Sequence, residues 1–281
     1  MTATKWVRVN RHRPCPACAH TDWCGLSADG TLVCCMRVRS DRPARNGGWL
    51  HRTADLPAGQ AGAPPPRIYV PPPAPMGDWL GLLSRFGRDT RTADIESLAV
   101  GLGVTPGSLR RLGIAWAGPH RAWAFPMFDA RRAIIGLRLR AEDGRKWAVA
   151  GSRNGLFWPD GLAGAGPLLV CEGPTDTAAL LDLGYDAIGR PCCTGAVEMV
   201  IEVVRRLRRG DVVVVADADT PGIEGAGRLA RALTEVGRRP KVIRPLWAKD
   251  ARAWVQAGAT RTVVDAAINN AMHWRGHHHG T

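Results

Sequence analysis

The sequence predicts an α/β protein whose main domain is a mostly parallel β-sheet flanked by helices, and two stretches carry this prediction. In residues 168–176 (LLVCEGPTD) and 211–222 (DVVVVADADTPG), an apolar run passes directly into acidic residues. An apolar run without alternation is typical of a strand that is buried on both faces. Helix-length segments separate the predicted strands, and crossovers of that length join parallel strands by right-handed connections. We expect the first of these helices to begin at Thr177 and a last helix to cover residues 260–274.

The acidic residues that follow the predicted strands are expected to lie together. Glu172 follows the first strand, and Asp217 and Asp219 follow a later one. The carboxyl ends of parallel strands meet at one edge of the sheet, where ligands bind in open α/β folds. Several carboxylates at one edge repel one another unless a cation lies among them, and Mg²⁺ is a hard ion that suits oxygen ligands. Capping a helix is the alternative role for such acids, and for Asp176 the two roles are evenly balanced.

The pairing of E-G-x-x-D after one strand with D-x-D after another resembles the Toprim domain. This domain is shared by bacterial-type primases, topoisomerases, some nucleases and a recombination mediator. The segments CEGPTD and ADADTPG match its two acidic motifs, and the resemblance covers about residues 167–256. It implies a catalytic site that binds Mg²⁺ or Mn²⁺ through four acids: Glu172, Asp217, Asp219 and Asp250.

The third acidic motif departs from the primase pattern. Primases of this type carry two acids one residue apart, whereas here Asp250 is followed by Arg252 in the second place. Either the second metal ion is held less well, or its remaining ligands come from water and substrate phosphates.

A cysteine cluster near the start of the chain predicts a structural zinc site. Five of the eight cysteines fall within residues 15–35, and four of them have the spacing C-x2-C-x5-C-x10-C: Cys15, Cys18, Cys24 and Cys35. Zinc takes four ligands at tetrahedral corners, and a C-x2-C turn supplies two of them. Because the chain looks cytosolic, five cysteines this close together indicate a bound metal rather than disulfides. Free buried thiols are the alternative.

The fourth ligand is open between two adjacent cysteines. Residues 27–30 (SADG) predict a hairpin turn that returns residues 31–35 as a strand. Cys34 and Cys35 then point to opposite faces of this strand, and spacing alone does not choose between them. The stretch resembles the zinc ribbon of primase-like proteins from phages and mobile elements. Their pattern has one cysteine just before a Met-Arg-Val-like step, which favours Cys35.

A small basic α+β region precedes the acidic motifs. Residues 122–125, 133–140 and 146–150 predict short strands, with two arginines on one alternating face of the second strand. Such a face is either a solvated surface or a contact for polyanions. The order of a G-x-R strand, a Lys-aromatic step and a small-residue turn resembles the basic subdomain that precedes Toprim in bacterial-type primases. The resemblance implies four nucleotide- or nucleic-acid-binding residues: Arg138, Arg140, Lys146 and Arg153.

Composition divides the chain into five predicted segments. Proline triplets at residues 64–66 and 71–73 favour an extended, semi-rigid spacer. The predicted segments are a zinc-ribbon domain (1–53), a proline-rich linker (54–77), the basic subdomain (78–165), the Toprim domain (166–258), and a C-terminal helix and tail (259–281).

The charge of the chain indicates a polyanionic partner. Its 281 residues include 38 Lys and Arg against 25 Asp and Glu, a formal net charge of +13. Nucleic acid is the default partner for such a balance, and an Arg-favouring genome is the alternative explanation. No stretch reaches the roughly 18 apolar residues of a membrane span. Residues 1–13 lack the apolar core of a signal peptide. We therefore expect a cytoplasmic protein without a membrane partner.

These features together predict a DNA primase-like nucleotidyltransferase. We expect it to make short primers from nucleoside triphosphates on single-stranded DNA during replication of a phage, mobile element or chromosome, with a separate replicative helicase as partner. The alternatives are a non-catalytic zinc and Toprim accessory of recombination or replication, and a Toprim nuclease. A topoisomerase needs a tyrosine nucleophile, and neither Tyr69 nor Tyr185 has an activating setting. The absence of G-x4-G-K-[ST] disfavours an ATP-dependent nuclease or a fused helicase.

Overall fold

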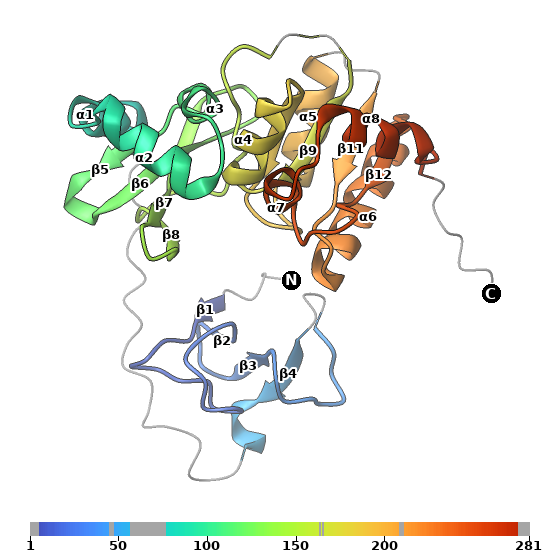
Figure 1. The fold of residues 1–281 in the computed structure, drawn as a ribbon. Helices are drawn as coiled ribbons and strands as arrows, with labels where there is room; N and C mark the ends of the chain where they lie inside the picture. Colours follow the sequence, from blue (N-terminus) through green and yellow to red (C-terminus); the bar gives the residue numbers. More distant parts are fainter. Residues whose placement is uncertain are drawn as a thin grey trace. The chain divides into compact units, whose positions relative to one another are not determined.

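The chain divides into two compact units, Met1–Pro72 and Pro73–Thr281, in the computed structural model (Figure 1). The structure describes residues 6–44, 48–56, 77–162, 164, 166–207 and 211–274. Most of the predicted proline-rich linker (57–76) and the predicted C-terminal tail (from residue 275) lie outside the described residues. Each unit is described by itself below.

The first unit contains a four-stranded antiparallel sheet in the order β1-β2-β3-β4. Its strands, followed by a short 3₁₀ helix (Thr53–Asp55), are β1 (Trp6–Arg8), β2 (Gly25–Ser27), β3 (Leu32–Cys35) and β4 (Trp49–Arg52). The predicted hairpin turn joins β2 to β3. The Gly30 amide donates to the Ser27 carbonyl over 2.9 Å, and Gly30 has a φ of +76°, which glycine adopts without strain.

The second unit begins with three helices that pack with a four-stranded antiparallel sheet in the order β5-β6-β7-β8. The helices are α1 (Trp79–Arg88), α2 (Thr92–Leu102) and α3 (Pro106–Arg111). The strands are β5 (Ala115–Ala117), β6 (Ala122–Phe128), β7 (Ile134–Ala141) and β8 (Lys146–Ala148), with a 3₁₀ turn (Gly118–His120) after β5. Helix α3 starts where Thr105 accepts a hydrogen bond from the Ser108 amide and Pro106 fills the first helical position.

The remainder of the second unit is a parallel α/β domain. Its sheet has the order β10-β9-β11-β12, and every pairing in it is parallel. The strands are β9 (Leu168–Glu172), β10 (Asp186–Arg190), β11 (Val212–Val215) and β12 (Lys241–Ile243). The helices are α4 (Pro174–Asp182), α5 (Val197–Arg206), α6 (Thr220–Glu235), α7 (Ala251–Gln256) and α8 (Arg261–Asn270).

Both faces of the parallel sheet are buried under helices, which is why its strands read as unbroken apolar runs. Leu169 and Val213 pack with residues of α4, α7 and α8 in one core cluster. Val170 and Val214 point the other way, into a second cluster with α5 and α6. The predicted fold class, a mostly parallel sheet flanked by helices with an N-terminal cysteine cluster, is confirmed. Among the described residues, no helix is both long enough and apolar enough to cross a membrane.

Two helix boundaries differ from the sequence expectation. Helix α4 begins at Pro174, three residues before the expected start, because Gly173 at φ +81° turns the chain directly into a helix with proline at its first position. The last helix ends at Asn270 rather than Trp274; the next residue, Ala271, has extended backbone angles.

The segment of Leu156 and Phe157 joins the two sheets of the second unit. Leu156 forms a backbone bridge with Phe128 of β6, and Phe157 forms one with Gly189 of β10. The amide of Phe157 donates to the carbonyl of Gly189 over 2.8 Å, and the amide of Gly189 donates to Phe157 over 2.9 Å. Phe157 also lies in the core cluster that contains Leu169 and Leu180. The basic antiparallel sheet is therefore fixed to the edge strand β10, close to the carboxyl ends of the parallel strands.

Adding a methyl group to Gly189 is expected to loosen this junction. A Cβ there would meet Thr177 Oγ1 and would lie 2.6 Å from the Gly173 carbonyl oxygen, which is backbone and cannot swing aside. Gly189→Ala should lower the free energy of unfolding by about 1–3 kcal/mol, measured by urea denaturation. The control is Gly87→Ala in helix α1, where nothing lies within 4 Å and alanine should add up to about 1 kcal/mol. Equal urea midpoints for Gly189→Ala and the wild type would contradict the tight junction.

Candidate functional site

The four sequence-predicted acids line one cavity at the carboxyl edge of the parallel sheet. Glu172 is the last residue of β9, and Asp217 follows β11 by two residues. Asp219 and Asp250 precede α6 and α7 as their N-caps. The cavity has a volume of about 480 Å³, and Asp176 from the first turn of α4 also lines it. We call it the acid cavity.

Helix capping and exposure to the cavity coexist in two of these acids. One carboxylate oxygen of Asp219 accepts the Gly222 amide over 2.7 Å. One oxygen of Asp250 accepts the Ala253 amide over 2.7 Å. The capping role proposed as an alternative is therefore real for both residues. It fixes the two carboxylates at the cavity wall and leaves each with a second oxygen.

Burial and mutual repulsion disturb the acids that lack such a cap. Burial, and then the charges of Asp176, Glu172 and Asp250, raise the pKa of Asp217 to about 7. Burial is also the main cause that raises the pKa of Asp176 to about 7, although its Oδ1 accepts the Arg252 amide over 2.9 Å. Two carboxyls at the same edge therefore resist ionisation, as expected where like charges share a desolvated site.

The acids share a cavity without converging on one point. In the described parts of the chain, the four N-terminal cysteines are the only set of three or more His, Cys, Asp or Glu whose ligand atoms all lie within 4.8 Å of one another. No three of these carboxylates therefore have ligand atoms that all lie within 4.8 Å of one another. Their donor set is oxygen only, which fits Mg²⁺ or Mn²⁺ and not a soft metal.

Basic side chains from the antiparallel sheet line the same cavity. Arg138 and Arg140 are two residues apart on β7 and therefore share one face of the sheet. Lys146 on β8 is the register partner of Arg140. All three line the acid cavity. The fourth predicted residue, Arg153, is exposed and lies outside the cavity lining.

Sequence reasoning assigned no binding role to three cations at this edge, which are Arg190, Lys249 and Arg252. Arg252 lines the acid cavity, and its Nη1 donates to the Leu102 carbonyl over 3.2 Å at the end of α2. Arg190 ends β10 as the register partner of Glu172 and is buried, and its charge opposes the rise in the pKa of Glu172 that burial causes. Arg252 was visible as a departure from the acidic motif. Arg190 gave no signal, because its position depends on strand pairing.

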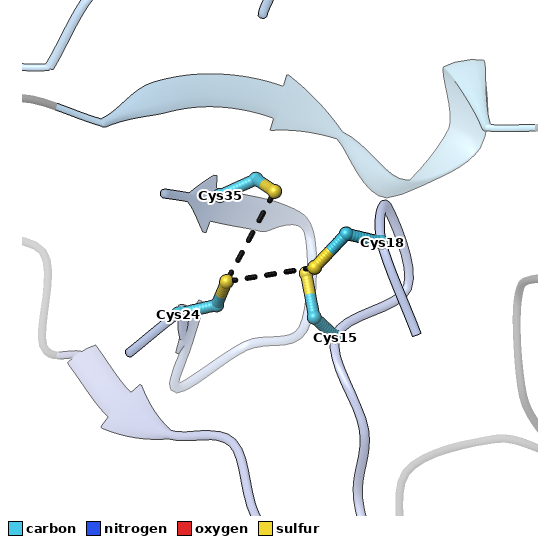
Figure 2. Close-up of side chains that lie close together, drawn as sticks. All are labelled: Cys15, Cys18, Cys24 and Cys35. Carbon is cyan, nitrogen blue, oxygen red and sulfur yellow. Dashed lines mark hydrogen bonds between the residues drawn. The ribbon is translucent and has the colours of Figure 1, made fainter. Parts of the chain in front are cut away.

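The four predicted zinc ligands converge in the first unit (Figure 2). The sulfur of Cys24 lies 3.7 Å from that of Cys18 and 4.0 Å from that of Cys35. A tetrahedral zinc with bonds of about 2.3 Å places its sulfurs about 3.8 Å apart, so the geometry fits Zn²⁺. Cys35 belongs to the cluster and Cys34 does not; a Cβ on Gly48 would lie 3.1 Å from the Cys34 sulfur. Adjacent side chains on β3 point to opposite faces, so only one of the two cysteines can reach the cluster. That cysteine is Cys35, the choice that spacing left open.

The Met-Arg-Val step after Cys35 supplies hydrogen bonds to the sulfurs. The Met36 amide donates to the Cys24 sulfur over 3.4 Å. The amides of Arg37 and Val38 donate to the Cys35 sulfur over 3.4 and 3.2 Å. Such donors orient thiolates and stabilise their negative charge around a metal.

Comparisons with known proteins agree with this geometry. Residues 169–253 match the protein family described as Toprim-like. The second unit therefore contains a Toprim domain. No curated protein sequence matches the chain.

Solved structures of primases share the fold of this Toprim domain and its neighbouring sheet. The E. coli primase catalytic core is 18% identical with a TM-score of 0.52, covering 69% of this chain and 79% of that one. A DnaG primase catalytic domain bound to single-stranded DNA is 16% identical with a TM-score of 0.53, covering 69% and 77%. The primase domain of bacteriophage T7 gp4, in a complex that contains an RNA/DNA hybrid and dTTP, is 18% identical with a TM-score of 0.50, covering 62% and 91%. At 16–18% identity, the structural likeness shows a shared fold and nothing beyond the fold.

Metal analysis of cysteine variants tests the zinc site. Wild-type protein purified without chelator should carry about one zinc per chain by elemental analysis. Cys15→Ser and Cys35→Ser should lose it, because each removes a corner of the tetrahedron. Cys34→Ser is the matched control and should keep it. Loss of zinc from Cys34→Ser alone, with Cys35→Ser unaffected, would reverse the assignment of the fourth ligand.

The raised pKa of Asp176 predicts a pH-dependent stability. Folding raises this pKa from its ordinary 3.8 to about 7, so the folded protein holds the proton more tightly than the unfolded chain does. The free energy of unfolding should therefore fall as the pH rises from about 4 to 7. In urea titrations at pH 5 and pH 8 without added divalent ions, Asp176→Asn should narrow the difference between the two values. The exposed Glu235→Gln serves as control, and an unchanged difference in Asp176→Asn would rule out this contribution.

Proposed function

We propose that this protein is a DNA primase-like nucleotidyltransferase that synthesises short primers on single-stranded DNA. The observation that carries the proposal is that one cavity is lined both by the Toprim acids and by the basic face of the neighbouring sheet. The shared fold with primase catalytic cores supports it. Among those structures, one primase catalytic domain is bound to single-stranded DNA, and one complex with primase domains contains an RNA/DNA hybrid.

In this proposal the acids hold divalent ions, with Mg²⁺ or Mn²⁺ as the metal. The proposed ligands are Glu172, Asp217, Asp219 and Asp250. Such ions, when bound, supply charge neutralisation for the triphosphate and for the attacking and leaving oxygens of an in-line displacement. The chain itself contributes position, because capping holds one oxygen of Asp219 and one of Asp250 and leaves the second oxygen of each carboxylate uncapped. Phosphoryl transfer of this kind requires no nucleophilic side chain.

The basic residues are proposed to bind phosphates. Arg138, Arg140 and Lys146 line the cavity opposite acids that would hold metal, so they can contact a triphosphate and the nearest template phosphates. Exposed Arg153 is proposed to contact template backbone outside the cavity. Phosphate contacts of this kind position the strand, and base pairing with the template supplies the sequence.

Arg252 changes how the third acidic motif works in this chain. Arg252 occupies the place of the second acid, so Asp250 is the one carboxylate of that motif. The Arg252 guanidinium donates to the Leu102 carbonyl and borders the cavity. We propose that water and substrate phosphates complete the coordination near Asp250. The same substitution favours one alternative, a non-catalytic accessory that binds DNA through the zinc and Toprim units.

The zinc unit is proposed to bind single-stranded template. Trp23 precedes the ligand Cys24 and is 67% exposed, so its ring is free to stack on a base. A separate replicative helicase is the proposed partner. The proposed location is the cytoplasm of a bacterial or phage-infected cell.

Primer synthesis with an active-site variant tests the proposal. Purified protein, mixed-sequence single-stranded DNA and labelled nucleotides should yield short products with Mg²⁺ or Mn²⁺. Asp217→Asn should reduce them on the order of 100-fold or more, because it removes a charged ligand that is worth several kcal/mol to the transition state. Glu224→Gln, an exposed acid on α6, is the matched control.

The outcomes separate the candidate functions. Undiminished synthesis by Asp217→Asn, with zinc content intact, would overturn the metal-dependent mechanism. Shortened template would indicate a nuclease. Tight DNA binding with no change in either strand would favour the accessory role.

A further inference from the structure

A pair of large apolar side chains is exposed beside the acid cavity. The loop between β12 and α7 carries Leu246, which is 65% exposed, and Trp247, which is 53% exposed. They line a hollow of about 560 Å³ whose other walls are formed by neighbouring loop residues and by Ala218 of the D-A-D turn. Single exposed apolar residues are common, but an adjacent pair in a hollow beside a site indicates a binding surface.

The indole of Trp247 is held by the folded core. Its ring packs edge-on against Trp254, with centroids 5.9 Å apart and planes at 78°. Trp254 is completely buried in the core cluster that also contains Leu169 and Val213 of the parallel sheet. The Ala218 amide donates to the Lys249 carbonyl over 2.8 Å, which ties the loop to the turn between Asp217 and Asp219. The exposed face of Trp247 is therefore a rigid platform at a fixed place relative to the acids.

Two exposed cations flank this platform. Arg244 and Lys249 both line the hollow, and both are exposed. Among the described residues, no carboxylate lies within 4.0 Å of the Arg244 guanidinium nitrogens, and Lys249 is 3.7 Å from Asp250. Lys249 also lines the acid cavity, so the hollow and the cavity adjoin. An aromatic face between cations complements a strand of bases and phosphates better than it complements an apolar protein surface.

We propose that Trp247 is a stacking platform for an unpaired base of single-stranded DNA, with Arg244 and Lys249 contacting the adjoining phosphates. The identity of the strand rests on the proposed function, which this inference extends with a path for DNA beyond the acid cavity. Every base presents a π-face, so a tryptophan platform accepts any sequence. A protein that copies varied templates needs such tolerance.

A pair of oligonucleotides separates stacking from charge. One is a labelled mixed-sequence single strand of about 16 nucleotides, and the other has the same phosphates with abasic sites throughout. Binding of the full chain is measured by fluorescence anisotropy without nucleotides or divalent ions. Trp247→Ala should weaken binding of the base-bearing strand about 5- to 150-fold and leave the abasic strand unaffected.

Three further variants sharpen the comparison. Trp247→Phe keeps an aromatic face and should retain most of the affinity, which also guards against a folding defect in Trp247→Ala. Leu80→Ala removes an equally exposed apolar side chain on α1 that does not line the hollow, and it should change neither affinity. Arg244→Ala should weaken both strands alike and reduce the slope of affinity against salt by about one unit.

The results distinguish this proposal from the proposed enzymatic function. Equal weakening of both strands by Trp247→Ala, or no weakening of the base-bearing strand, would overturn the platform. A wild-type chain that binds neither strand would also overturn the platform. So would tighter DNA binding by Trp247→Ala than by the wild type, which is the result expected if the zinc unit covers the loop. Base-dependent loss in Trp247→Ala would keep the platform even if the primer-synthesis assay gave no product.

Discussion

The repulsion among carboxylates at one sheet edge is the constraint that shapes this protein. A parallel sheet brings the carboxyl ends of its strands to one side, so acids that follow different strands cannot avoid one another. Two helix starts relieve the conflict: Asp219 and Asp250 each give one oxygen to an amide of a first turn, where the helix dipole also favours negative charge. Asp217 is the N-cap of neither helix, and burial together with the neighbouring acids raises its pKa to about 7. Helices α6 and α7 therefore allow the acids to coexist as well as covering the sheet.

The antiparallel sheet supplies the positive charge of the cavity through the register of β7 and β8. Alternation on β7 puts Arg138 and Arg140 on one face, and the β7–β8 pairing adds Lys146 beside Arg140. The backbone bridge between Phe157 and Gly189 then holds this face to the edge strand of the Toprim sheet. Because both sheets belong to one packed unit, the basic face of β7 and β8 and the acids keep their relative positions at the cavity.

The sequence was sufficient to predict those features that depend on residues close together in the chain. Apolar runs that end in acid located β9 and β11. The cysteine spacing located the cluster, while the choice of Cys35 over Cys34 needed the phase of β3. Arg190 was out of reach, since its place beside Glu172 is set by the pairing of β10 with β9. The contact of Arg252 with Leu102 joins residues 150 positions apart, and no spacing rule reports it.

The loop of residues 244–250 joins two properties that are usually separate. At its end, Asp250 caps α7 and lines the acid cavity, and near its middle Trp247 lies against the buried Trp254. The Lys249 carbonyl accepts the Ala218 amide within the D-A-D turn, so a backbone hydrogen bond joins the loop to the turn that carries Asp217 and Asp219. A strand that rests on Trp247 is therefore held by the same backbone that places Asp217 and Asp219. In such an arrangement, contact with the strand and the placement of the acids are linked through one backbone hydrogen bond.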